Sequence, residues 1–216
     1  MKKLLLVLVP CVCCMLHSQT FDLTTGRVPV VSLDGLWRFH TGDNPAWADP
    51  SFDDSNWPLL RSDNGWDSQG YKGYSGLAWY RFQVTVPAEL EHISLFLPKT
   101  LSSYEVYADG RLIANDGKMP PHAASYSSYM EYHAYALPAR KPGQQKIVVA
   151  LRVWKWPKEH SVSGGGPQHG GGLLGDTGAI EKRSDLLDTP FHVTIPQLQF
   201  PSPVLIPAWV QIQNQV

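Results

Sequence analysis

Cysteine is scarce in this chain of 216 residues, and its three copies, Cys11, Cys13 and Cys14, all lie close to the N-terminus. The rest of the sequence therefore has no thiol for a disulfide, a catalytic nucleophile or a cysteine-ligated metal. Stability must come from a hydrophobic core, and a chain of this length can bury one.

Long apolar runs are also rare. The run from Leu4 to Leu16 has 13 residues, fewer than the roughly 20 that a membrane-spanning helix needs. Lys2 and Lys3 precede it and the small region His17–Thr20 follows, which is typical of a secretory signal peptide over residues 1–19. We therefore expect a secreted or periplasmic protein, with an uncleaved membrane anchor as the alternative.

Charge of one sign is not in excess. The chain carries 18 Lys and Arg, 19 Asp and Glu, and no basic run. A formal net charge of −1 gives no general attraction to nucleic acid or to an acidic membrane. No nucleic-acid partner is expected. Membrane contact would come only from an uncleaved signal segment or from a region downstream.

Helical periodicity is weak, whereas strand signals are frequent. The chain has 18 Gly, 18 Pro and 11% aromatic residues, a composition that favours strands and turns. Residues 78–86 and 146–153 alternate apolar with polar side chains, as half-buried strands do. Asp109-Gly110 suits a type I′ hairpin turn within 103–113. Short strands at about ten-residue spacing predict an all-β sandwich or barrel over residues 28–158.

The C-terminal part differs in composition. Residues 159–216 read as a Gly-rich linker, one short helix over 179–188, and a Pro-rich tail from residue 189 that has no charged residue. Proline at this density excludes a transmembrane helix there.

Several sequence pieces, in this order, resemble the N-terminal sugar-binding domain of family 2 glycoside hydrolases such as β-galactosidase and β-glucuronidase. They are Leu33–Phe39, Phe52–Trp57, the strand from Trp79 to Pro87, the hairpin Val106–Gly110, and the strand within Gly143–Val153. The resemblance covers most of residues 30–156. It implies a galactose-binding-like jelly-roll β-sandwich and a saccharide or glycan partner.

A closer resemblance is to sensor regions of bacterial signalling proteins that carry a stage II sporulation protein E-type phosphatase. It rests on Trp37–Asp43, Gln69–Gly76, Arg152–Pro157, Gly164–Pro167 and Gly175–Asp176. The favoured function is therefore a non-catalytic, extracytoplasmic ligand-binding module that acts as the input domain of such a phosphatase. The alternative is the sugar-binding domain of a family 2 glycosidase, and a protein–protein interaction domain is a third possibility.

No catalytic residue is expected. Glycosidases need two acids across the scissile bond, and in the family these are glutamates of a separate barrel domain. The adjacent Asp53 and Asp54 are better explained as a structural turn. The histidines lack the spacing of a zinc site. Loop acids such as Asp63, Asp67 and Asp116 leave a structural calcium ion open, although no calcium-loop pattern is present; no other cofactor is expected.

The best binding signal is the loop DNGWDSQGYKGY over residues 63–74, which we expect to be exposed. Trp66, Tyr71 and Tyr74 are candidates to stack on sugar C–H faces, while Asp63, Asn64 and Lys72 are candidates for sugar hydroxyls. The alternative is that the aromatic side chains cap the sandwich. Arg81 either faces the ligand or pairs with an internal acid, and the pattern does not separate the two. Other large aromatic residues, Trp37, Trp57, Trp79 and Tyr80, are assigned to the core.

Overall fold

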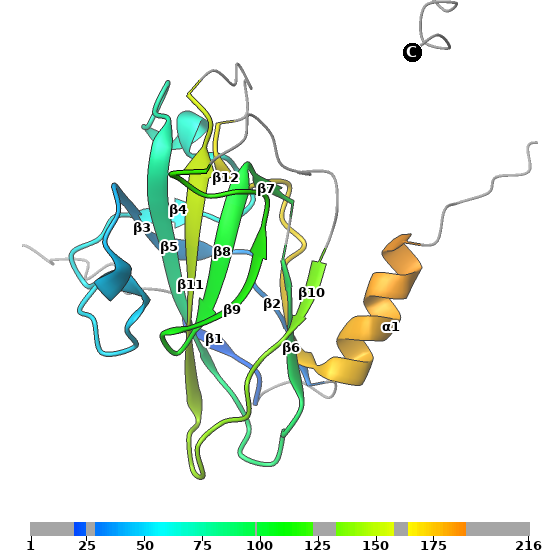
Figure 1. Cartoon of the computed structure of the whole chain (residues 1–216). Coiled ribbons are helices and arrows are strands. Elements are labelled where there is room, and N and C mark those ends of the chain that lie inside the picture. The colour runs from blue at the N-terminus through cyan, green and yellow to red at the C-terminus, as the bar shows by residue number, and fades with distance from the viewer. Residues whose placement is uncertain (1–19, 25–28, 98, 123–132, 158–163, 189–216) are drawn as a thin grey trace, which may run out of the picture.

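The fold consists of two β-sheets packed face to face, with one helix outside the smaller sheet (Figure 1). The computed structural model describes residues 20–24, 29–97, 99–122, 133–157 and 164–188. The predicted signal peptide, residues 1–19, and the Pro-rich tail lie outside the described residues. The all-β jelly-roll sandwich predicted from the sequence is confirmed.

The larger sheet is built around the long pair β5 (Gly76–Thr85) and β11 (Lys146–Lys155), which run antiparallel over their full lengths. β1 (Thr20–Asp22) extends the sheet by pairing in parallel with the end of β5. The remaining order is β4 (Leu59–Arg61), β3 (Leu36–Thr41), β5, β11, β8 (Ser103–Ala108) and β9 (Arg111–Asp116).

The hairpin between β8 and β9 turns where the sequence predicts. Asp109 and Gly110 both have positive φ angles, 46° and 80°. A type I′ turn needs this conformation at its two central residues. Local sequence therefore determines this turn.

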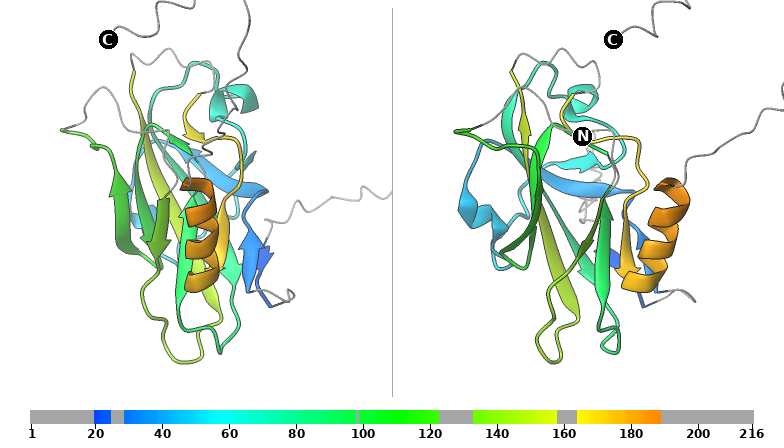
Figure 2. Two further views of the ribbon diagram at one scale, coloured as in Figure 1. Left: turned by 90° about the vertical axis from the view of Figure 1, so that its right-hand side faces the viewer. Right: turned by 45° about the vertical axis from the view of Figure 1, so that its right-hand side comes forward.

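The smaller sheet has the order β10 (His133–Ala136), β6 (Ile93–Leu97), β13 (Leu173–Asp176) and β2 (Val30–Ser32). A two-stranded ladder joins β7 (Thr100–Leu101) to β12 (Gly166–Pro167). The helix α1 (Thr177–Asp188) packs on the outer face of the smaller sheet, with Ile180 buried against it (Figure 2). No helix in the described part of the chain is long and apolar enough to cross a membrane.

The Gly-rich segment was predicted to be a linker, and this prediction is wrong for residues 164–176. β13 hydrogen-bonds to β6 on one side and to β2 on the other, so it is an inner strand of the smaller sheet. A Cβ atom at Gly165 would overlap the Trp66 ring, and one at Gly166 would overlap Tyr80. Glycine is required here because the backbone lies directly on two core rings. The sandwich therefore extends well beyond residue 158.

The main core fills the space between the two sheets. Inward-facing residues alternate along β5 and β11, as the period-two pattern predicted. They pack with side chains from β3, β6 and β8. The hydroxyl groups of Tyr104 on β8 and Tyr135 on β10 are hydrogen-bonded at 2.9 Å, which joins the two sheets. Trp37 and Tyr80 belong to this core, as expected.

A second cluster lies on the opposite face of the larger sheet. Residues 42–58, here called the outer lobe, fold over β3, β5 and β11 and include the short helix η1 (Pro45–Ala48). Trp57 of the lobe and Trp79 of β5 are buried there, with Phe52 packed at the edge. Both sides of the sheet are thus covered here, so residues 78–82 of β5 are buried without interruption.

Two ion pairs fasten the outer lobe to the sheet. Arg81 donates to Asp54 at 2.7 Å and to the carbonyl oxygens of Trp47 and Phe52. Arg152 binds Asp43 through two nitrogens, at 2.8 and 2.6 Å. Asp43 also accepts the indole N–H of Trp79 at 3.0 Å. Adjacent strands of the sheet therefore each hold the lobe through an arginine.

The pair at Asp43 predicts a loss of stability in acid. Burial by itself would raise the pKa of Asp43, but hydrogen bonds from Arg152 and Trp79 outweigh it, so the pKa lies below its ordinary value. A carboxyl group with a lowered folded-state pKa stabilises the protein above the unfolded pKa near 4, and this contribution is lost as pH falls through the folded pKa. We expect Asp43→Asn to lower the free energy of unfolding by about 1–2 kcal/mol at pH 7.

The same deficit should shrink as pH is lowered toward 3, because the wild-type carboxylate becomes protonated too. Urea unfolding of the wild type and of Asp43→Asn at several pH values measures this difference in the free energy of unfolding. Glu181→Gln on the exposed surface of α1 is the control and should show no such dependence. A deficit that stays constant with pH would exclude the Asp43 carboxylate as its source.

Candidate functional site

Three chain connections meet at the end of the sandwich that holds the predicted loop. They are residues 33–35 between β2 and β3, residues 62–75 between β4 and β5, and residues 168–172 between β12 and β13. Backbone hydrogen bonds join them: Ser62 donates to Gly35 at 2.9 Å, His169 to Asp63 at 3.0 Å, and Leu33 to Gly172 at 2.8 Å. The connections therefore form one rigid surface.

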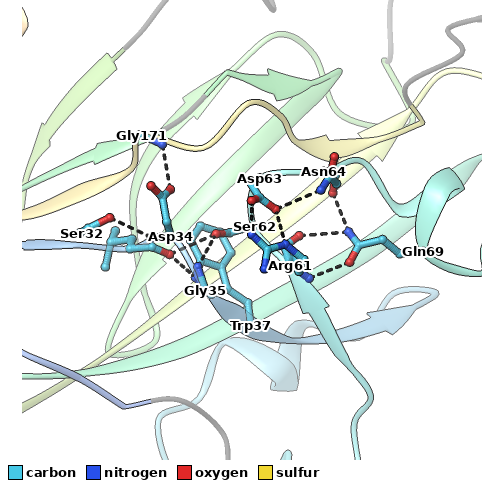
Figure 3. A network of polar contacts seen from close by, with 11 residues as sticks. Ser32, Asp34, Gly35, Trp37, Arg61, Ser62, Asp63, Asn64, Gln69 and Gly171 are labelled. Atoms are coloured by element: carbon cyan, nitrogen blue, oxygen red, sulfur yellow. Dashed lines mark hydrogen bonds and ion pairs between the residues drawn. The ribbon is translucent and has the colours of Figure 1, made fainter.

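A group of hydrophilic side chains covers this surface (Figure 3). Asp63 pairs with the guanidinium of Arg61 and accepts the Asn64 amide at 3.1 Å. Gln69 accepts the Arg61 backbone N–H at 2.7 Å and donates to the Asn64 carbonyl at 2.7 Å. On the neighbouring connection, Asp34 accepts the backbone N–H of Gly171 at 2.8 Å. We call Asp34, Arg61, Asp63, Asn64 and Gln69 the polar patch.

Within the polar patch, the Asp63 carboxylate has a lowered pKa. The hydrogen bond from Arg61, above all, lowers the pKa of Asp63, with smaller contributions from the positive charge of Arg61 and the Asn64 amide. The Arg61 side chain remains 58% exposed. An ionised carboxylate, a guanidinium and two amides are thus presented together to solvent. Fixed donors and acceptors of this kind suit the hydroxyl groups of a sugar.

The loop was expected to be exposed, and for Trp66 this is wrong. Trp66 opens the short helix η2 (Trp66–Gln69) and is 0% exposed. Its ring stacks on Tyr80 with centroids 6.4 Å apart and contacts Phe39 and Tyr74. Its indole N–H donates to the Tyr74 carbonyl at 3.1 Å. Because core groups cover its ring faces, Trp66 has no free face for a ligand. For Trp66 the alternative prediction is therefore the right one: its ring caps the sandwich.

The other two aromatic residues of the loop, Tyr71 and Tyr74, are intermediate in solvent exposure. Tyr71 packs edge-on against Phe39 at 4.7 Å, and Tyr74 donates its hydroxyl to the Leu77 carbonyl while accepting the Gly42 N–H at 3.1 Å. Both remain partly exposed. Lys72, between them, is exposed. Tyr71, Lys72 and Tyr74 thus keep some surface for a ligand.

Arg81 lies on the outer face of the larger sheet, below the outer lobe, and is 2% exposed. Of the two alternatives left open by the sequence, the structure shows the internal ion pair. Asp54 is its partner, and Asp53 bonds the backbone N–H of Ser55 at 3.0 Å, so both acids are structural, as expected.

A buried ion pair lies beneath η2. Lys155, at the end of β11, donates to Asp67 at 3.2 Å, and the side chains are 5% and 15% exposed. Gly164 packs on Asp67 so closely that a Cβ atom would not fit. This pair fixes the base of the loop rather than reaching the surface.

Sequence reasoning missed Asp34, Arg61 and Gln69. Asp34 was assigned only to a turn, and its neighbour Gly171 is far away in sequence. Arg61 has a local signal, since it stands two residues before Asp63 at the end of a strand. The described residues contain no cluster of three or more acids, histidines or cysteines that could hold a metal ion.

Two surface grooves are described, and each is lined by a single carboxylate, Glu91 in one and Glu89 in the other. Glycoside hydrolysis uses a pair of carboxylates on either side of the bond. Neither groove therefore holds such a pair among the described residues.

No family model matches the chain, and no curated protein is significantly similar to it in sequence. Solved structures do match. A glycosyl hydrolase family 2 member from Bacteroides cellulosilyticus superposes with a TM-score of 0.52 at 18% identity, over 68% of this chain and 20% of that one. A β-glucuronidase from glycoside hydrolase family 2 gives a TM-score of 0.51 at 13% identity, over 67% and 17%.

This chain spans about a fifth of the length of those enzymes. At such identities the similarity shows the fold, a galactose-binding-like sandwich of the kind found in family 2 glycoside hydrolases. The resemblance to phosphatase sensor regions gains no support from these matches.

Proposed function

We propose that this chain is a saccharide-binding module of the type that forms the sugar-binding domain of family 2 glycoside hydrolases, and that it acts outside the cytoplasm. The observation that carries the proposal is the polar patch, an exposed and rigid set of amide, carboxylate and guanidinium groups at one end of a galactose-binding-like sandwich. The signal-peptide pattern of residues 1–19 supports export to the periplasm or the medium.

Asp63 and Asn64 are the proposed contacts to sugar hydroxyls, with Lys72 and the exposed edges of Tyr71 and Tyr74 beside them. Trp66 and Arg81 are excluded from these contacts by their burial. The glycosidic activity of the structural neighbours is not assigned to this chain. The reading as the input domain of a phosphatase rests on sequence pieces alone, so we favour the glycoside hydrolase type of module.

Substitution of Asn64 tests the site. Asn64→Ala removes one donor and one acceptor from an exposed position, and we expect about a five- to tenfold weaker affinity for the bound saccharide, the value of one hydrogen bond. A glycan array would select the saccharide, and isothermal titration calorimetry would measure its affinity for both proteins.

Asn115→Ala is the matched control, because Asn115 is also an exposed asparagine but lies on β9, at the opposite edge of the larger sheet from β4. It should leave saccharide affinity unchanged. Equal losses of saccharide affinity in Asn64→Ala and Asn115→Ala would contradict the proposal. A glycan array on which no saccharide binds would contradict it too.

A further inference from the structure

The groove lined by Glu91, of about 530 Å³, lies at the end of the sandwich opposite the polar patch. The connection between β5 and β6 forms one wall, the connection between β10 and β11 forms the other, and Thr177 at the start of α1 contributes to it. Figure 1 shows both connections at the lower end of the two sheets, away from η2. Small-molecule sites commonly have volumes of about 300–1,000 Å³, and the volume of this groove lies in that range.

Arg140 holds the two walls together. Its guanidinium donates to the Gln144 carbonyl at 2.6 Å within its own connection and to the Pro87 carbonyl at 2.8 Å across the groove. It also donates to the carbonyl of Leu90. Since one side chain bonds both connections, the groove is formed before any ligand arrives. Preformed sites lose less entropy on binding.

The groove carries excess positive charge. Arg140 and Lys141 line it together with one acid, Glu91. Among the described residues, every hydrogen-bond acceptor of Arg140 is a carbonyl oxygen, and neither cation has a carboxylate within ion-pair distance. Carbonyl oxygens solvate a guanidinium but do not neutralise it. The Arg140 charge therefore adds to that of the exposed Lys141 at the groove mouth.

The rest of the lining includes apolar as well as polar groups. Ile93 lines the groove but is only 3% exposed, whereas Leu137 and Pro142 offer apolar surface. Such surface can contact the C–H face of a sugar ring, while the side chains of Lys141 and His92 can reach its substituents. We propose that this groove binds an acidic monosaccharide unit, with the ligand carboxylate directed to Lys141 in the positive field of Arg140. The site is distinct from the polar patch and does not rest on it.

Galacturonate and galactose are the probes, because they differ only in the carboxylate. Titration followed by ¹⁵N–¹H NMR on the intact protein should show galacturonate shifting the amide signals of the groove, Leu137 and Gly143 among them, while galactose leaves these signals in place. Cyclohexanecarboxylate, a ring carboxylate without hydroxyls, should bind several-fold more weakly than galacturonate.

Two charge variants of opposite sign test the residues. Lys141→Glu should weaken galacturonate binding by tenfold or more, and Glu91→Gln should strengthen it about two- to threefold, since one exposed charge interaction has a free energy of up to about 1 kcal/mol. Both side chains are exposed, so neither change should affect folding. Lys118→Glu, an exposed residue beyond the far end of β9, is the control and should leave the affinity unchanged.

Equal shifts with galactose and galacturonate would overturn the role of the carboxylate. Equal affinity for cyclohexanecarboxylate would overturn the assignment to a sugar. Affinity that is unchanged in both Lys141→Glu and Glu91→Gln would overturn the groove as the site. Asn64→Ala should not alter these shifts, so failure of the polar patch and failure of the groove are separable.

Discussion

Replacing Trp66 by alanine is expected to lower the free energy of unfolding by about 3–5 kcal/mol, the range for removing a buried large aromatic side chain. The ring is 0% exposed and contacts Phe39, Tyr74 and Tyr80. The Gly165 backbone lies against it and moves only at the expense of the β7–β12 ladder. The site cannot collapse easily, so the cavity remains. Urea unfolding followed by circular dichroism measures the loss.

Trp66→Phe should cost less, because the ring contacts are partly kept and the main loss is the hydrogen bond to the Tyr74 carbonyl, about 1 kcal/mol. The control is Leu112→Ala on β9. Leu112 is 54% exposed, and its removal should change stability by less than about 0.5 kcal/mol. Unchanged stability in Trp66→Ala, combined with lost saccharide binding, would show that the ring faces a ligand and would refute the burial.

Replacing Arg81 by alanine is the second large effect, with an expected loss of about 3–5 kcal/mol. Three consequences combine: Asp54 loses its ion-pair partner, the carbonyl oxygens of Trp47 and Phe52 lose a donor, and a cavity opens beneath the outer lobe. The loss should also loosen the lobe locally. Hydrogen exchange of residues 44–57 should accelerate more than exchange in β11.

Arg61→Ala is the matched comparison, because Arg61 also pairs with an aspartate but is 58% exposed. Exposed ion pairs typically contribute between 0 and about 1 kcal/mol. Arg81→Met, which keeps the apolar stem, separates cavity from charge. If Arg81→Ala and Arg61→Ala destabilised the protein equally, Arg81 would not be the buried anchor described here.

Local patterns predict the strands of this fold well. The alternation along residues 78–86 and 146–153 corresponds to β5 and β11, since successive side chains of a strand point to opposite faces of the sheet. Asp109-Gly110 predicts its turn because few residue pairs tolerate two positive φ angles. These signals are contained within a few consecutive residues.

The inner strand β13 could not be predicted in this way. Its four residues, Leu173–Asp176, include a glycine and follow a run of glycines, a composition that indicates a flexible segment. What makes the preceding glycines ordered is contact with Trp66 and Tyr80, about a hundred residues earlier. Such a contact leaves no local pattern.

The candidate site could be predicted only in part, again because contacts between distant segments leave no local pattern. Asp63 and Asn64 were identified from the loop composition, and both belong to the polar patch. Trp66 was misplaced because an aromatic residue in a polar loop has the same local sequence whether it points outward or into the core. The role of Arg81 could not be decided from the sequence, because the outer lobe that covers it, residues 42–58, is distant from it in the sequence.

The position of β13 also constrains how this protein is made. The chain emerges N-terminus first, whether from the ribosome or from an export channel, and domains generally fold as units. β2 and β6 lack their common neighbour until residue 176 has emerged, so their inner edges stay unpaired up to that point. Unpaired edges invite association with other chains. Before β13 closes the smaller sheet, the emerging chain therefore carries two strand edges that are paired in the finished fold.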